Sequence, residues 1–177
     1  MPERKVAIFC SASYDIDRKY NEAAREAVRA LHSYGCTIVS GGCIKGTMGA
    51  IADESARCGG RHIGIVPRFM KDLKFPGLDE VFWTDTMSER KALMREGTEA
   101  VIAFPGGIGT LDELIETHVL AKLGKYSGRI FALNLDGFFE PFKALLDHYV
   151  ATGMLDEASR RLVEFPDTVE ELAGFFN

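Results

Sequence analysis

The sequence predicts an α/β fold in which a doubly wound parallel sheet carries helices on both of its faces. Two observations support this prediction: short apolar runs of β character alternate with helical segments, and glycine-rich turns follow the runs at residues 37–40 and 100–104. Alternation of this kind favours strands that are buried on both sides. Because 177 residues suffice for one well-packed core and are few for two, we expect a single domain over residues 1–177.

The first half of the chain repeats a strand–helix unit. Strands are predicted at residues 5–10, 37–40 and 62–66. Between the first two, apolar residues recur at helical spacing from Tyr20 to Leu31, and Gly35 ends that helix. A second helix is marked by apolar residues from Met48 onward and ends at Cys58. The result is a βαβαβ rhythm.

The second half continues the alternation after an irregular stretch. Residues 67–78 contain Pro76 and Gly77, so we expect a loop that is able to cover a site. Ser88 is predicted to cap a helix that continues to Gly97. Further strands are predicted at 80–83, 100–104 and 130–134, and further helices from 110, around 142–150 and at 168–176. Such sheets bind ligands at the carboxyl ends of their strands, where the glycine turns lie.

The composition argues against several classes of function. A formal net charge of −5 does not favour nucleic-acid binding. No apolar run approaches the ~20 residues of a membrane span, and no leader pattern opens the chain, so we expect a cytoplasmic protein. The four cysteines lack Cys-x-x-Cys spacing and the four histidines form no metal-spaced cluster. We therefore expect reduced thiols and no metal.

The segment Pro105–Glu113, PGGIGTLDE, combines an anion cradle with a carboxylate. Its three glycines let the backbone turn sharply between strand and helix, and the unpaired N–H groups of the first helical turn can bind phosphate or carboxylate. Glu113 lies about one turn into the helix and brings a negative charge beside that site, so it is a candidate catalytic group. For Asp112 and Glu116 we prefer the simpler interpretation that they complement the helix dipole.

A second glycine-rich turn, residues 40–49 (SGGCIKGTMG), also joins a predicted strand to a predicted helix. Its Gly41, Gly42 and Gly46 are candidate ligand contacts, because two such turns in one sheet can enclose a nucleotide from both sides. The Gly-x-Gly-x-x-Gly dinucleotide fingerprint does not follow the first strand, and Lys45-Gly46-Thr47 has the wrong order for a P-loop. Hydride transfer and ATP hydrolysis lose support, and we expect no nicotinamide or other cofactor.

The segment Met87–Met94, MSERKALM, begins a predicted helix with two adjacent cations. Taken alone, it is most simply an amphipathic helix with Leu93 and Met94 inward and a solvated charged face. Two anion-binding turns in an otherwise acidic chain favour a second interpretation. In that interpretation Arg90 and Lys91 are partners for a ligand phosphate or for the candidate carboxylate.

Together these segments resemble a known family. PGGIGTLDE is similar to the PGGxGTxxE signature, and MSERKALM to the M-x-x-R-K motif, of the LONELY GUY family of cytokinin riboside 5'-monophosphate phosphoribohydrolases. The resemblance runs from residues 9–13 to residues 133–139. It implies a Rossmann-like homodimeric enzyme that hydrolyses the N-glycosidic bond of a nucleoside 5'-monophosphate, AMP or an N6-modified AMP, to free base and ribose 5-phosphate.

The resemblance also implies roles for individual residues. Arg90 and Glu113 would be catalytic. The nucleotide would be held by Lys91, Gly106, Gly107, Gly109 and Thr110, and the candidate substrate contacts also include Ser13 and His118. His118 stands where the family tends to have a small hydroxyl residue, and the alternative for it is a histidine on the helix surface. Members are often labelled lysine decarboxylases, but no sequence feature here argues for a pyridoxal cofactor.

The chemistry of the residues agrees with that reaction. Breaking a ribosyl bond builds positive charge on the sugar, which Glu113 can stabilise while it orients or deprotonates water. Arg90 is too basic to donate a proton, so we assign it to positioning the ribose phosphate and the carboxylate. The main rival hypothesis is a non-catalytic nucleotide carrier or sensor, for which a carboxylate at the anion cradle would be of no benefit.

Overall fold

A computed structural model describes residues 3–177, and within them seven strands form one parallel sheet. The strands are β1 (Arg4–Phe9), β2 (Cys36–Ser40), β3 (His62–Pro67), β4 (Glu80–Thr84), β5 (Ala100–Ala103), β6 (Arg129–Ala132) and β7 (Val163–Glu164). The α-helices are α1 (Arg18–Ser33), α2 (Gly46–Cys58), α3 (Met87–Arg95), α4 (Ile108–Lys122), α5 (Glu140–Ala151), α6 (Glu157–Arg160) and α7 (Val169–Gly174). Two 3₁₀ helices, η1 (Arg68–Leu73) and η2 (Leu135–Gly137), complete the set.

The sheet is doubly wound, as the sequence predicts. Its strand order is β4-β3-β2-β1-β5-β6-β7, so the chain builds outward from β1 in one direction and then crosses to β5 to build in the other. Every pairing is parallel. The segments that follow β1 and β5 run to opposite faces of the sheet. The carboxyl ends of these two strands therefore form the crevice where such sheets bind ligands.

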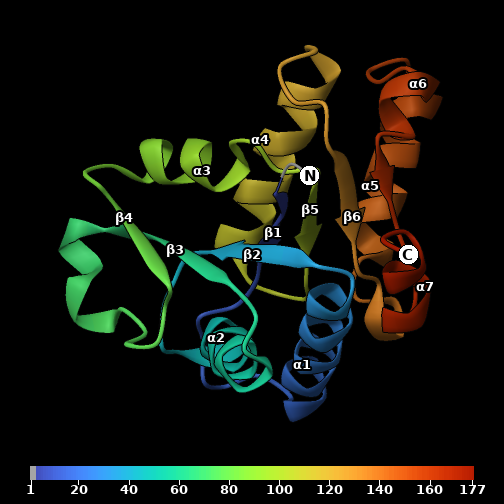
Figure 1. The fold of residues 1–177 in the computed structure, drawn as a ribbon. Helices are drawn as coiled ribbons and strands as arrows, with labels where there is room; N and C mark the ends of the chain where they lie inside the picture. Colours follow the sequence, from blue (N-terminus) through green and yellow to red (C-terminus); the bar gives the residue numbers. More distant parts are fainter. Residues whose placement is uncertain (1–2) are drawn as a thin grey trace.

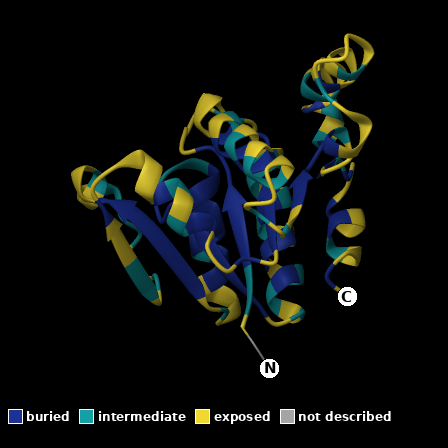
Figure 2. Cartoon of the chain, turned by 90° about the horizontal axis from the view of Figure 1, so that it is seen from above, coloured by how far each residue is buried: buried dark blue, intermediate teal, exposed yellow. Residues whose placement is uncertain are grey.

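Two apolar cores lie on opposite faces of the sheet. Along β1, Val6 and Ile8 belong to the core under α1, α2 and α7, whereas Ala7 and Phe9 belong to the core under α3, α4 and α5. Figure 1 shows α1 and α2 on one side of the sheet and α3 and α4 on the other, and in Figure 2 the central strands are buried. None of the helices within residues 3–177 has both the length and the apolar composition that crossing a bilayer requires.

The structure corrects several predicted element boundaries. Thr86, not Ser88, caps α3, because its hydroxyl accepts from the Glu89 N–H while the Glu89 carboxylate accepts from the Thr86 N–H, which forms a capping box. Residues 67–78, predicted as an irregular loop, contain the 3₁₀ helix η1. The short elements α6 and β7 were not predicted, because four and two residues carry too little periodicity to be recognised.

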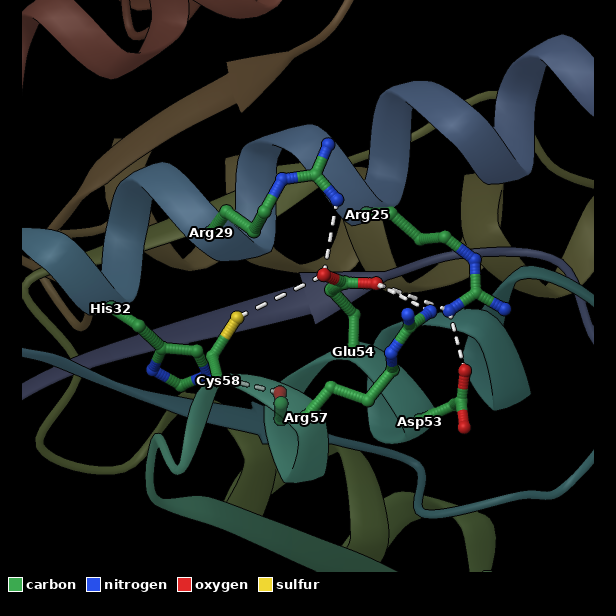
Figure 3. A network of polar contacts seen from close by, with 8 residues as sticks. Arg25, Arg29, His32, Asp53, Glu54, Arg57 and Cys58 are labelled. Atoms are coloured by element: carbon green, nitrogen blue, oxygen red, sulfur yellow. Dashed lines mark hydrogen bonds and ion pairs between the residues drawn. The ribbon is translucent and has the colours of Figure 1, made fainter.

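An ion cluster joins α1 to α2 (Figure 3). The buried Glu54 carboxylate accepts from Arg29 at 3.0 Å and from Arg25 at 3.3 Å, and Arg25 also bonds Asp53 at 2.6 Å. Burial alone would raise the pKa of Glu54, but the hydrogen bonds from the two arginines hold that pKa below its usual value. The cluster therefore holds α2 against α1.

Candidate active site

A cavity of about 430 Å³ opens at the carboxyl ends of β1, β2 and β5. The segment after β1 lines it, α3 and α4 supply charged side chains, and η1 supplies Met70. Its lining consists of Cys10, Ser11, Ala12, Ser13, Cys43, Met48, Met70, Met87, Arg90, Lys91, Gly107, Gly109, Thr110, Asp112 and Glu113. Both sequence motifs thus meet at one cavity, which lies at the predicted crevice.

The turn between β5 and α4 presents a row of free backbone donors. Gly107 is the N-cap of α4, and no side chain caps the helix. The first backbone bond of the helix runs from the Leu111 N–H to the Gly107 carbonyl, and within residues 3–177 no acceptor takes the N–H groups of residues 106–110. A Cβ built on Gly107 or Gly109 would meet nothing within 4 Å. This turn can therefore approach and bind an anion such as phosphate.

In the turn between β2 and α2, most backbone N–H groups already have acceptors within the protein. The N–H groups of residues 42–45 are taken in turn by Ser40 Oγ, Met48 Sδ, the Leu73 carbonyl and Cys43 Sγ. Gly41, Gly42 and Gly46 do not line the cavity. A Cβ on Gly46 would lie 2.5 Å from the Ser13 carbonyl oxygen, so this glycine allows close packing of two backbone segments. The structure does not place this turn as a second cradle around the cavity.

Glu113 and Arg90 form the charged centre of the cavity. Arg90 Nε donates to the Ile65 carbonyl at 3.0 Å, and Arg90 Nη1 lies 3.9 Å from Glu113 Oε1. Both side chains are more than nine-tenths buried. Burial raises the pKa of Glu113 to about 7, although the positive charge of Arg90 acts in the opposite direction. A carboxyl whose pKa is raised toward neutrality is suited to act as a general base.

Lys91 lines the cavity but is already paired. Its ammonium lies 2.9 Å from the Asp112 carboxylate and 3.4 Å from that of Glu116, and Arg95 bonds Glu116 at 2.7 Å. The hydrogen bond that Lys91 donates to the Asp112 carboxylate raises the pKa of Lys91, which keeps the ammonium charged. Asp112 and Glu116 thus join α4 to α3, in addition to any effect on the helix dipole, and they hold Lys91 at the edge of the cavity.

The remaining predicted contacts divide between two places. Ser13 lies at the cavity, where its hydroxyl accepts from the Asp15 N–H. Gly106 lines a neighbouring pocket and not this cavity, and a Cβ built on it would meet Thr110 Oγ1. His118 is neither at this cavity nor on the helix surface. It is buried, with Nε2 2.7 Å from the Ser159 carbonyl oxygen, and it faces a separate apolar pocket. The structure therefore gives His118 a packing role behind α4.

Sulfur-bearing side chains at the cavity were missed by sequence reasoning. Cys10, Cys43, Met48, Met70 and Met87 all line it. Burial raises the pKa of the Cys10 thiol, so that this group is neutral beside Glu113. Only Met87 had a signal, as the first residue of the M-x-x-R-K motif. Within residues 3–177, no three His, Cys, Asp or Glu side chains gather as a metal site requires.

Comparisons with known proteins show which family this chain resembles. A family model described as "Possible lysine decarboxylase" matches residues 48–174. The cytokinin riboside 5'-monophosphate phosphoribohydrolase LOG of Oryza sativa subsp. japonica is 36% identical over 96% of this chain and 71% of its own length. The cytokinin riboside 5'-monophosphate phosphoribohydrolase of Mycobacterium tuberculosis is 33% identical over 94% of this chain and 89% of its own length.

The fold is shared with solved structures of lower sequence similarity. The molybdenum cofactor binding protein from the phototrophic bacterium Rippkaea orientalis superposes with a TM-score of 0.75, covering 99% of this chain and 96% of that one. The two sequences are 19% identical, so the likeness shows the common architecture alone. It confirms the Rossmann-like fold that the sequence predicts.

Proposed function

Because the chain belongs to the LOG family of cytokinin riboside 5'-monophosphate phosphoribohydrolases, we propose that it hydrolyses the N-glycosidic bond of a nucleoside 5'-monophosphate. The observation that carries this proposal is the pairing, at one cavity, of a free N–H cradle with a buried carboxylate of raised pKa. The N–H cradle would bind the 5'-phosphate, and the carboxylate would stabilise the positive charge that grows on the ribose. The products are the free base and ribose 5-phosphate.

In the proposed mechanism the phosphate binds the N–H groups of residues 106–110, which places the ribose beside Glu113. As the carbon–nitrogen bond breaks, positive charge grows on the ribose and is stabilised by the Glu113 carboxylate. Glu113 also orients a water molecule and accepts its proton as the oxygen bonds to the sugar carbon. In the net reaction one hydrogen of water remains on the new sugar hydroxyl and the other ends on the base.

Arg90 holds the charged centre in place. Its Nε donates to the Ile65 carbonyl, and its Nη1 lies 3.9 Å from the Glu113 carboxylate. Because a guanidinium has five N–H donors, others remain for the nucleotide. The guanidinium favours the ionised form of Glu113, and ionisation is required of a group that stabilises a cation. Arg90 therefore acts on both the carboxylate and the bound nucleotide.

The sulfur-bearing side chains support a purine as the base. Met48, Met70 and Met87 bring flexible, polarisable thioethers to the cavity, and thioethers make favourable contacts with aromatic rings. Such a surface also accommodates an apolar substituent without a specific polar partner. We propose AMP and N6-modified AMP as the substrates.

A homodimer is proposed from a second feature of α4. Ile115, Val119 and Leu123 lie along one helix face and are 41%, 49% and 63% exposed, and a pocket continues this apolar face to Leu145 and Tyr149 of α5. A second copy of the chain would cover it. Val119→Lys should convert a dimer into a monomer in sedimentation equilibrium, and a monomeric wild-type protein at micromolar concentration would contradict the proposal.

The reaction is tested by incubating the protein with nucleoside 5'-monophosphates and separating the products by chromatography. AMP and N6-modified AMP should give free base and ribose 5-phosphate. Adenosine lacks the phosphate and forfeits two or three charge-assisted hydrogen bonds, so its kcat/KM should be at least ~100-fold lower. Binding of AMP without release of base would instead favour the nucleotide carrier or sensor.

Two expectations from composition stay predictions. The net charge of −5 predicts no binding to nucleic acid, which a gel-shift assay at low salt tests. A cytoplasmic location is tested by cell fractionation.

A further inference from the structure

Gly41, at the end of β2, leaves a slot that the Arg90 guanidinium fills. A Cβ built on Gly41 would lie 1.7 Å from Arg90 Nη2, 2.9 Å from Arg90 Cζ and 2.8 Å from Met48 Sδ. Gly41 is not among the glycines with a positive φ, so its backbone conformation is open to any residue. The glycine is therefore required here by the space that the guanidinium occupies.

The slot fixes the guanidinium from three sides. The Ile65 carbonyl at the end of β3 accepts from Nε at 3.0 Å, the Cα of Gly41 faces Nη2, and Glu113 of α4 lies 3.9 Å from Nη1. The atoms that a new methyl group at Gly41 would strike are the far ends of two flexible side chains. Such a conflict is relieved by moving the guanidinium and the thioether, whereas the backbone can stay in place.

We propose that Gly41 is a positioning residue, whose missing side chain holds the Arg90 guanidinium beside the Glu113 carboxylate. This replaces its predicted role as a ligand contact. The position of the guanidinium follows from these contacts, whereas the effect on turnover rests on the proposed function. Gly41→Ala should therefore fold normally and still lose the interaction between the two charged groups.

The direct test is the titration of the Glu113 carboxyl by NMR in ¹³C-labelled protein, which requires no turnover. An opposite charge at this distance lowers the pKa of a carboxyl by about one unit or more. The Glu113 pKa should rise by about one unit in Gly41→Ala, as in Arg90→Ala. The matched control is Gly77→Ala, whose Cβ would meet only the Phe75 ring, at 2.9 Å, and there the Glu113 pKa should be unchanged.

Turnover of AMP gives a second test through a double-mutant cycle. Gly41→Ala should lower kcat at least ~10-fold in the wild-type protein and have no further effect when Arg90 is already alanine. A Glu113 pKa that is identical in Gly41→Ala and wild type, or a loss of kcat that persists without Arg90, would overturn the proposal. If wild type shows no turnover, the proposed function fails and the carboxyl titration still decides the role of Gly41.

Discussion

The turn after β2 and the turn after β5 both join a strand to a helix through several glycines, yet they differ in how many of their backbone N–H groups have acceptors within the protein. Residues 42–45 donate to acceptors of the protein itself, whereas the donors of residues 106–110 stay free. The helices that follow differ as well. Six residues after the N-cap, α4 carries Glu113 at the cavity, and α2 carries Ile51 in the apolar core.

This comparison shows that glycine content alone does not identify a ligand cradle. Glycine permits close approach, and the approaching group can be another segment of the same protein or a ligand. At Gly46 it is the backbone of Ser13, while at Gly107 and Gly109 the space is open. A turn that binds a ligand and a turn that packs against the protein are distinguished by the residue one to two turns into the following helix, which is Glu113 in α4 and Ile51 in α2. A carboxylate is costly to bury at such a position without a function or a partner.

The largest expected effect is that of Glu113→Gln, which removes the charge and keeps the volume. Its kcat for AMP should fall at least ~100-fold, because the growing positive charge on the ribose loses its stabilising carboxylate. AMP affinity, measured by calorimetry, should be retained or rise, since a negative charge near the phosphate is removed. Near-wild-type turnover in single-turnover assays would reject the catalytic role and favour the nucleotide carrier.

Two glycine substitutions, one in each turn, should have different effects: one on the stability of the protein and the other on AMP binding. Gly42 has a φ of +65°, and a Cβ there would lie 2.9 Å from Val66 Cγ2, so Gly42→Ala should lower the free energy of unfolding by ~1–3 kcal/mol. Gly109 lies in open space in the first turn of α4, so Gly109→Ala should keep or slightly raise stability. Its methyl group would obstruct the cradle and should weaken AMP binding at least ~10-fold.

These two variants are compared by urea unfolding and by calorimetry with AMP in the Glu113→Gln background, where AMP is not consumed. We predict that Gly42→Ala loses stability and that Gly109→Ala loses AMP binding. A stable Gly42→Ala protein together with an unfolded Gly109→Ala protein would reverse the assignment of the two turns.

The smallest effect expected is on the pH dependence. Because burial raises the pKa of Glu113 to about 7, the ionised and active form is lost as the pH falls through 7. The value of kcat/KM, which reports the free enzyme, should fall about 10-fold from pH 8 to pH 6. A profile that is flat across this range would show that another group limits the reaction.

Much of the architecture follows from periodicity in the sequence. Alternating strands and helices predict the parallel sheet, and PGGIGTLDE with MSERKALM predict the meeting of Glu113 and Arg90, which the structure places 3.9 Å apart. The difference between the glycine turns was not predictable in this way. It depends on tertiary acceptors such as the Leu73 carbonyl, which lies 29 residues along the chain from the Ile44 N–H that donates to it.

The positions of His118 and Met70 were also not predictable from the sequence. His118 has a helical position that suits either the surface or a site, and in the structure it is buried and bonds the Ser159 carbonyl of the C-terminal segment. Met70 lies in a stretch without periodicity, and it reaches the cavity because bonds from the Ile44 and Phe75 N–H groups tie this stretch to the β2–α2 turn. Contacts between distant segments decide both cases.

The most direct test of the open cradle is an amide NMR titration with AMP, in Glu113→Gln protein so that the nucleotide stays intact. We predict that the amide signals of residues 106–110 shift strongly with AMP and much less with adenosine, because their free N–H groups bind the phosphate. The donors of residues 42–45, already bonded within the protein, should shift little. Strong phosphate-dependent shifts at residues 42–45 with none at residues 106–110 would show that the phosphate binds the turn after β2 and not the turn after β5.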